Sequence, residues 1–408
     1  MPHSAVSAER IDVLVAGAGP GGAAAALLLA RAGLRVVAVD GATFPRDKAC
    51  SEFMSPAAVA ILDRLGVLPE LDAAGARPSG TIVHGPRGAV LTGLFERSVA
   101  APLRTTGLAV ARRILDARLV LAARAAGALI HEGTAVQDLL YEGGGVGGVV
   151  VRGPDGISRV IRARLTIGAD GLRSIVARRL GRRRHGHPRR IAFVAHVDGV
   201  TGLKTAAEMH VASFGYVGLN PVGGGVTNVA LVVPRAAAAA ARGDVAGFFQ
   251  RMLARFPGVA GRVNLERTTR EILVTGPFAA RAARVTAAGA LLLGDAAEFF
   301  DPFTGEGIYH ALHGAELAAE VAVAALRRPG IARGGDLLSY RSLRRRAFAG
   351  QWAVERIIGW MMFAPALFDR SVARLERRGL AHTLIGVTGD ILPARAVLNP
   401  GFLLRTVL

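Results

Sequence analysis

The feature that most constrains the fold is a glycine-rich run at residues 17–22, Gly-Ala-Gly-Pro-Gly-Gly, set between two apolar segments. The segment before it, Ile11–Ala16, is short and apolar and ends at a glycine, which predicts a buried strand. Residues 23–32 predict a helix that Gly33 caps at its C-terminus. Residues 35–40 predict a second strand, so this opening stretch indicates one right-handed β-α-β unit.

The run has the spacing Gly-x-Gly-x-x-Gly, in which each glycine has its own role. Gly17 allows the tight turn, Gly19 removes the side chain that would hold a pyrophosphate away, and Gly22 lets helix and strand pack closely. Free N–H groups at the start of the helix that Pro20 opens can bind phosphates. Asp40, at the end of the second strand, can accept hydrogen bonds from ribose hydroxyls. The pattern predicts a dinucleotide site, and the alternative is a glycine-rich turn without a ligand.

A second glycine-rich turn lies far down the chain, after a buried strand predicted at residues 290–294. The strand ends at Gly294-Asp295, and residues 301–307, Asp-Pro-Phe-Thr-Gly-Glu-Gly, lead into a helix. Asp295 can accept hydrogen bonds from a polyol such as ribitol, and the amides around residues 305–308 suit an anionic flavin. A domain that binds only a nicotinamide cofactor has no use for this second site, which argues against a plain NAD-dependent dehydrogenase.

Together these motifs resemble the FAD-dependent oxidoreductases of the p-hydroxybenzoate hydroxylase fold, a superfamily of aromatic hydroxylases, flavin halogenases and geranylgeranyl reductases. Three of its signatures occur here in order: residues 17–22 with Asp40, Gly-Ala-Asp-Gly at residues 168–171, and Gly294-Asp295 with the turn after it. Arg112 matches an arginine that the family places against the FAD. The resemblance covers essentially the whole chain.

The resemblance implies an α/β fold of mixed α+β character, with a Rossmann-type FAD-binding domain, an inserted antiparallel β-sheet substrate domain and C-terminal helices. We expect the discontinuous FAD-binding domain at residues 1–80, 100–190 and 285–325. We expect the substrate domain at residues 81–99 and 191–284, and the helical region at residues 326–408.

The resemblance also implies where FAD lies: its pyrophosphate at residues 17–22, its ribitol near Asp295 and its ring facing the sheet of the substrate domain. NAD(P)H would bind transiently in a surface groove, because the chain has no second fingerprint for it. Asp170 would hold arginine side chains or a helix N-terminus near the pyrophosphate, or form a structural turn. The expected FAD contacts are Gly17, Gly19, Pro20, Gly22, Asp40, Arg112, Val136, Asp170, Gly294, Asp295, Pro302, Gly305, Gly307 and Ile308.

Two segments resemble the geranylgeranyl reductase-like branch: FPRDKACSEFMSP at residues 44–56 and GDAAEFFDPFTGEGIYHAL at residues 294–312. Residues 216–221, Tyr-Val-Gly-Leu-Asn-Pro, depart from the branch's Tyr-x-Trp-x-Phe-Pro pattern. This departure predicts a rebuilt pocket and favours an NAD(P)H-dependent monooxygenase acting on a hydrophobic aromatic or polyketide-like molecule. Reduction of carbon–carbon double bonds in a prenyl or lipid chain, halogenation and non-redox flavin binding stay open.

The candidate catalytic residues are Cys50, Pro302 and Tyr216. Cys50 either places its thiol beside the flavin or only fills space as a small buried residue. Pro302 borders the place where oxygen would be transferred. Glu52 and Glu306 are interpreted as proton donors or as pocket walls.

The composition of the chain limits the classes of partner and ligand that we expect. The formal net charge is +19, but the densest basic run, residues 178–190, holds no aromatic residue to stack on a base, so we expect no nucleic acid. Contact with an anionic membrane surface or a carrier stays open. His310 and His313 lack further ligand spacing, so no metal site is expected. The single cysteine, Cys50, excludes an internal disulfide and indicates a reducing compartment.

Two apolar stretches bear on location. Residues 13–30 contain the glycine-rich run and follow Asp12, unlike a secretory signal peptide. Residues 357–368 are too short to span a bilayer, and the default for them is core packing, with a pocket cap, a partner contact or a membrane contact as alternatives. We expect a cytoplasmic monomer or homodimer, with peripheral membrane contact left open.

Overall fold

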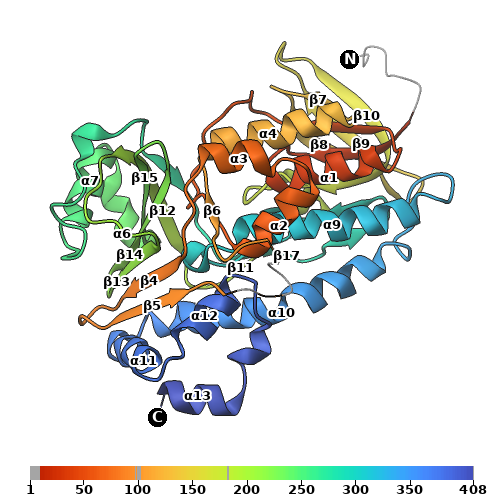
Figure 1. Ribbon diagram of the computed structural model, residues 1–408. Helices are drawn as coiled ribbons and strands as arrows, with labels where there is room; N and C mark the ends of the chain where they lie inside the picture. The colour runs from red at the N-terminus through yellow and green to blue at the C-terminus, as the bar shows by residue number, and fades with distance from the viewer. Residues whose placement is uncertain (1–9, 97, 99–102, 182, 408) are drawn as a thin grey trace.

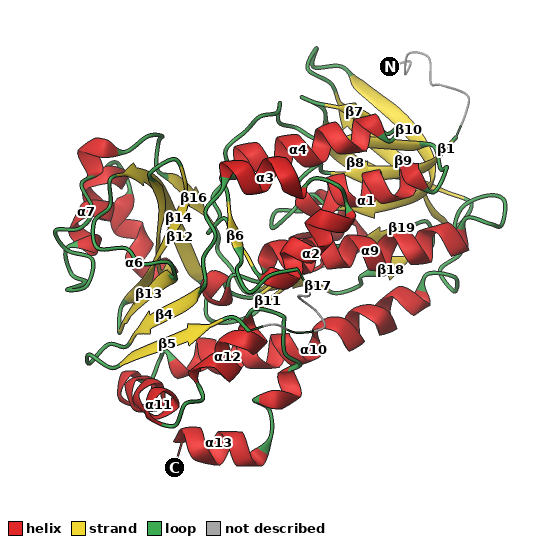
Figure 2. Ribbon diagram, in the orientation of Figure 1, coloured by secondary structure: helices red, strands yellow, loops and turns green. Residues whose placement is uncertain are grey.

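The computed structural model describes residues 10–96, 98, 103–181 and 183–407 (Figure 1). It contains two large sheets with helices packed against both, which confirms the mixed α/β architecture expected from the sequence (Figure 2). The first sheet belongs to the part of the chain that carries the glycine-rich turns. The second lies on the opposite side of the molecule, and the C-terminal helices run beneath both (Figure 1).

The first sheet has a parallel centre. Its main path is β18 (Thr286–Ala287), β19 (Ala290–Leu292), β10 (Ser158–Gly168), β1 (Ile11–Ala16), β2 (Val36–Val39) and β7 (Leu129–His131). β8 (Ala135–Glu142) and β9 (Gly145–Arg152) form an antiparallel extension of β10.

The sheet is covered on both faces, so the central strand β1 is apolar throughout its buried part. Val13 and Val15 face a core shared with the helices, whereas Leu14 and Ala16 face a core shared with β8 and β9. The helices are α1 (Pro20–Arg31), α2 (Pro56–Arg64), α4 (Arg112–Ala125) and α9 (Gly307–Ala325).

The second sheet is antiparallel except for one pair of strands. Its order is β16 (Leu273–Thr275), β12 (Arg190–Asp198), β15 (Val226–Pro234), β14 (Gly215–Gly223), β13 (Ala207–Ala212), β4 (Gly80–His84) and β5 (Val90–Leu94). β4 pairs in parallel with β13. Glycines 223–225 stand between two apolar runs, a pattern that predicts a hairpin, and β14 and β15 pair as that hairpin. α7 (Val245–Leu253) covers one face, and the C-terminal helices pack against the other.

The C-terminal segment is helical, as its pattern predicts. It comprises α10 (Leu338–Met361), α11 (Pro365–Arg377), α12 (Ala381–Thr388) and α13 (Pro400–Val407). These helices share a core with β4 and β5. Among the described residues, none of the helices has the length and apolar character needed to cross a bilayer.

Two boundaries differ from what the sequence pattern predicts. The glycines within residues 143–148 predict a turn there, but the turn is shorter, because Gly143 and Gly144 take positive φ angles and β9 begins at Gly145. The pattern of residues 129–140 predicts one strand, but the structure has two, β7 and β8, with Gly133 at positive φ between them. The expected boundary between residues 81–99 and 100–190 falls on residues 97 and 99–102, which lie outside the described part.

Candidate functional site

One cleft follows the carboxyl ends of β1, β2 and β10, the edge at which open α/β sheets bind ligands. It consists of two adjoining cavities that share Gly19, Lys48 and Ala169 in their walls. Most of the residues expected to contact FAD line it. Gly17, Asp40, Val136 and Asp170 line the outer part, and Pro20, Arg112, Gly294, Asp295, Pro302, Gly305, Gly307 and Ile308 line the inner part.

The glycines of the first turn have different neighbours. Gly17 has a φ of +95°, and a Cβ there would lie 2.6 Å from the carbonyl oxygen of Ala169. A Cβ on Gly22 would lie 1.8 Å from the carbonyl oxygen of Gly17. Gly22 is therefore required by the turn itself and does not line the cleft. Gly19 is different, because a Cβ there would meet nothing closer than the Nη2 of Arg46 at 3.6 Å.

Three cationic side chains gather beside Gly19. Arg112 donates from Nε and Nη2 to Asp116 at 2.8 Å each, and Nη1 of Arg46 lies 2.9 Å from the same carboxylate. Lys48 lines the cleft next to them, and desolvation there, together with the charge of Arg112, lowers its pKa. Buried cations require counter-charges, and the single carboxylate of Asp116 faces two guanidinium groups. The donor set therefore fits a pyrophosphate, which these three residues and the amides of α1 can hold.

The two expected carboxylates of the outer cleft are both used to brace turns. Asp40 accepts from the amides of Ala18 and Ala42, at 2.8 Å and 2.9 Å, and its oxygens retain lone pairs for ribose hydroxyls. Asp170 accepts from the amides of Ile175 and Val176 at the start of α5 (Ile175–Leu180). Asp170 therefore holds the N-terminus of α5, an arrangement that fits both a structural turn and a role beside the pyrophosphate.

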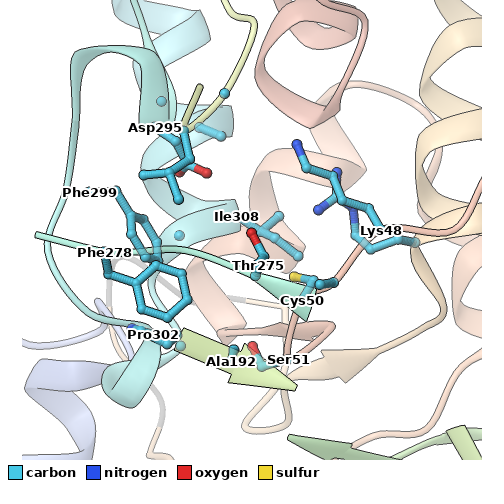
Figure 3. A pocket seen from close by; sticks show the side chains of 18 of the residues that line it. Lys48, Cys50, Ser51, Ala192, Thr275, Phe278, Asp295, Phe299, Pro302 and Ile308 are labelled. Atoms are coloured by element: carbon cyan, nitrogen blue, oxygen red, sulfur yellow. The ribbon is translucent and has the colours of Figure 1, made fainter. Parts of the chain in front are cut away.

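The second turn places an acceptor in the inner cleft. Gly294 has a φ of +54° and begins the short helix α8 (Gly294–Ala297). Asp295 and Lys48 lie on opposite sides of the pocket (Figure 3). Burial raises the pKa of Asp295, against the nearby charges of Lys48, Arg112 and Arg183. Within the described residues, no side chain donates a hydrogen bond to the Asp295 carboxylate, which fits an acceptor for ribitol hydroxyls.

The far end of the inner cleft is apolar and holds Cys50. Its walls come from β12, β13, β14, β15, the loop after β16 and the segment of the second turn, and they include Ala192, Val194, Met209, Ala230, Val232, Phe278 and Phe299. Cys50 lies in the wall, and its sulfur accepts from the amide of Glu52 at 3.3 Å. Burial lowers the pKa of Arg112, but the charges of Asp116 and Cys50 raise it more, so the guanidinium stays charged.

Glu52 lies behind the wall of the cleft and does not line it. The residue is fully buried, and its Oε1 accepts from the amide of Arg112 at 2.8 Å. Its Oε2 is 2.5 Å from Nε2 of His196 and accepts from Nδ2 of Asn228 at 2.8 Å. These bonds tie the first sheet's helix α4 to strands β12 and β15 of the second sheet.

Tyr216 presents its ring to the cleft, whereas its hydroxyl points into the protein. The hydroxyl donates to Asp301 at 2.6 Å, and Asp301 also accepts from Arg190 at 2.7 Å. Burial and the charge of Asp301 raise the pKa of Tyr216 well above its ordinary value.

Glu306 lies behind the second turn in a cluster with His310 and Asp390. It accepts from Thr304 Oγ1 at 2.7 Å, and burial together with Asp390 raises its pKa well above the ordinary value. Burial raises the pKa of Asp390 as well and lowers that of His310 to about 3. Burial therefore favours the neutral form of each of these three groups. His313 instead bonds Glu316 at 3.0 Å.

Sequence reasoning missed Arg46, Lys48 and Asp116 as members of the site. The signal was present in the segment FPRDKAC, which the resemblance placed beside the flavin ring. Asp116 could be found from its i,i+4 spacing to Arg112 on one helix, which suits an ion pair.

Comparison with known proteins agrees with this geometry. A family model described as an FAD binding domain matches residues 10–355. A menaquinone reductase of Mycolicibacterium smegmatis is 34% identical over 332 residues, covering 76% of each chain. A digeranylgeranylglycerophospholipid reductase of Methanothermobacter thermautotrophicus is 30% identical over 376 residues, covering 90% of this chain and 91% of that one.

The fold is also found among solved structures. A flavoprotein/dehydrogenase from Cytophaga hutchinsonii superposes with a TM-score of 0.81 at 21% identity, covering 98% of this chain and 97% of the other. The family model spans more than half of the chain, so the family is shown. The chain belongs to the FAD binding domain family and is an FAD-dependent oxidoreductase of the p-hydroxybenzoate hydroxylase fold.

Proposed function

We propose that the enzyme takes electrons from NAD(P)H and reduces carbon–carbon double bonds in the isoprenoid chain of a lipid or quinone. The observation that carries the proposal is a second apolar cavity that adjoins the inner cleft. The two cavities share Met209, and each has a volume of about 160 Å³. Phe303 lines the second cavity and directly follows Pro302 of the first.

The shape of the two cavities favours a long isoprenoid chain over a single aromatic ring as the substrate. An aromatic substrate needs only the inner cleft beside the flavin site. An isoprenoid chain is long and apolar, and the second cavity offers it walls from four C-terminal helices and from β4 and β5. Because the favourable free energy of binding such a chain grows with the apolar area removed from water, both cavities together suit it.

The proposed chemistry needs a hydride and a proton, one for each carbon of the double bond. When bound, FAD supplies the hydride after it has been reduced by NAD(P)H. We assign the proton to the thiol of Cys50, which lies in the cleft wall. The charged Arg112, whose pKa Cys50 helps to raise, then stabilises the thiolate until solvent returns a proton. The apolar walls exclude water from the reacting carbons.

The names of the relatives support the same reaction type. The menaquinone reductase is 34% identical to this chain, and the digeranylgeranylglycerophospholipid reductase is 30% identical. The sequence favours hydroxylation through residues 216–221. In the structure, the Tyr216 hydroxyl bonds to Asp301, and Asn220 donates to the carbonyl of Ser51 at 2.9 Å. With both donors engaged, that segment gives hydroxylation no particular support.

Product analysis tests the proposal. The purified protein is incubated in air with NADPH and either a prenylated quinone or a geranylgeranyl lipid in detergent, and the products are weighed by mass spectrometry. We expect a gain of two hydrogen atoms in the chain. A gain of one oxygen atom, or NADPH consumption with both substrates unchanged, would overturn the proposal. The Cys50→Ala variant should bind FAD normally and form the product more slowly.

A further inference from the structure

The second cavity opens at the protein surface between exposed apolar side chains. Ile357 of α10 and Leu403 of α13 line the cavity, yet 40% and 41% of their surfaces are exposed, so they form its rim. Trp360, one helical turn beyond Ile357, is 54% exposed and lies 5.7 Å from the exposed ring of Phe363, measured between centroids. Leu404, next to Leu403, is exposed as well. We call Ile357, Trp360, Phe363, Leu403 and Leu404 the apolar rim.

Scattered exposed apolar residues are ordinary on soluble proteins, but two of these line one cavity and the other three are close to them in sequence, on or just after α10 and on α13. They include Trp and Phe, the bulky aromatic side chains that settle at the level of lipid headgroups. Helices α11 and α13, which adjoin or carry the rim, lie below the second sheet, and α10 runs toward them from beneath α9 (Figure 1).

The C-terminal segment that carries the rim is rich in positive charge. Residues 338–408 contain eleven arginines and no lysine, against four carboxylates. Two of those carboxylates, Glu355 and Asp390, are buried, and burial raises the pKa of each well above its ordinary value. Arg378 donates to the carbonyl of Arg405, which places two exposed guanidinium-bearing residues beside Leu404.

We propose that the apolar rim docks on an anionic lipid bilayer, so that the second cavity receives the substrate's chain directly from the membrane. An apolar rim inserts among the acyl chains, while arginines around it contact lipid phosphates. The inference rests on the proposed function for the identity of the chain, but the docking itself does not depend on turnover.

A second copy of the chain fits this surface poorly. Two copies that met rim to rim would bring their arginines together, and like charges across an interface oppose association. An anionic bilayer, by contrast, supplies apolar depth and negative charge at the same place.

Vesicle co-sedimentation of the oxidised, FAD-loaded protein tests the proposal without substrate. We expect binding to phosphatidylglycerol vesicles, weaker binding to phosphatidylcholine vesicles and weakening by high salt. The double variant Trp360→Asp, Leu404→Asp should bind phosphatidylglycerol vesicles at least about tenfold more weakly, because both side chains lose their insertion free energy. Leu121→Asp is the matched control: Leu121 is 50% exposed on α4, in the nucleotide-binding part, and should have no such effect.

A spectroscopic measurement locates the contact. The chain has two tryptophans, so Trp352→Phe leaves Trp360 as the only one. Its fluorescence should be quenched by vesicles that contain brominated phosphatidylglycerol. No binding to either vesicle, equal loss of binding in the rim variant and the Leu121 control, or a rim-dependent dimer in sedimentation without vesicle binding would overturn the proposal.

The two proposals fail separately. Vesicle binding without any chain reduction would overturn the proposed function alone. Reduction of a detergent-solubilised isoprenoid chain by a protein that does not bind vesicles would overturn only the proposed membrane docking.

Discussion

Replacing Gly19 by alanine should weaken FAD binding while leaving the stability of the fold almost unchanged. Gly19 has a φ of −67° and a ψ of −175°, a conformation that alanine adopts without strain. The added Cβ would lie 3.6 Å from Nη2 of Arg46 and 3.8 Å from Nη2 of Arg112, which are ordinary contacts. We therefore expect the free energy of unfolding of the apoprotein to change by less than about 0.5 kcal/mol.

The same methyl group points between the cationic side chains and the N-terminus of α1, where the pyrophosphate would bind. Loss of one or two charge-assisted hydrogen bonds there costs about 1.5–3 kcal/mol each. Since 1.4 kcal/mol corresponds to tenfold in affinity, the Kd for FAD should rise by about ten- to several-hundred-fold or more.

The assay compares FAD titrations of apo wild type and Gly19→Ala by flavin fluorescence, with thermal unfolding of both apoproteins. Gly335→Ala is the control, because a Cβ on Gly335 meets nothing within 4 Å and the residue lies outside the cleft. Unchanged FAD affinity in Gly19→Ala, or an apoprotein that unfolds much more readily than wild type, would refute the reasoning.

Three further changes test other parts of the account. Glu52→Ala leaves three buried donors, on Arg112, His196 and Asn228, without their acceptor and should cost about 3–5 kcal/mol in denaturant unfolding; a loss below 1 kcal/mol would contradict the bridging role. Cys50→Ser should keep the FAD affinity and lower the rate of chain reduction in stopped-flow measurements, because a hydroxyl is a weaker acid than a thiol; an unchanged rate would remove Cys50 from proton delivery. Because burial raises the folded-state pKa of Glu306 above its ordinary value of 4.5, this group's contribution to stability is complete below pH 4.5 and is lost as pH rises toward the folded pKa. Glu306→Gln should therefore gain in melting temperature relative to wild type between pH 5 and pH 8, and parallel pH profiles would contradict this.

The parts of the fold that the sequence predicts well are those with local causes. The unit formed by β1, α1 and β2 follows from apolar runs and glycines within residues 11–40, and the structure reproduces β1 residue for residue. The hairpin of β14 and β15 likewise follows from the glycines between them. Errors occur where a glycine interrupts a run, as at Gly133, because the pattern alone does not say which sheet each half joins.

Long-range contacts explain the rest. Glu52 has no periodic signal, and its role arises because α4, β12 and β15 meet around it. The hydroxyl of Tyr216 points away from the cleft only because Asp301, far along the chain, is there to accept its hydrogen bond. The second cavity depends on how four helices pack against β4 and β5, which no local pattern encodes.

The central claim is that the flavin site passes electrons to an isoprenoid chain, and an anaerobic absorbance experiment tests it most directly. NADPH is added to the FAD-loaded protein without oxygen until the oxidised flavin bands bleach, and a prenylated quinone or geranylgeranyl lipid with an unreduced chain is then added. We predict that the oxidised bands return without air, in step with loss of a double bond from the chain. Bands that stay bleached until air is admitted, with the chain then unchanged or oxygenated, would contradict the account.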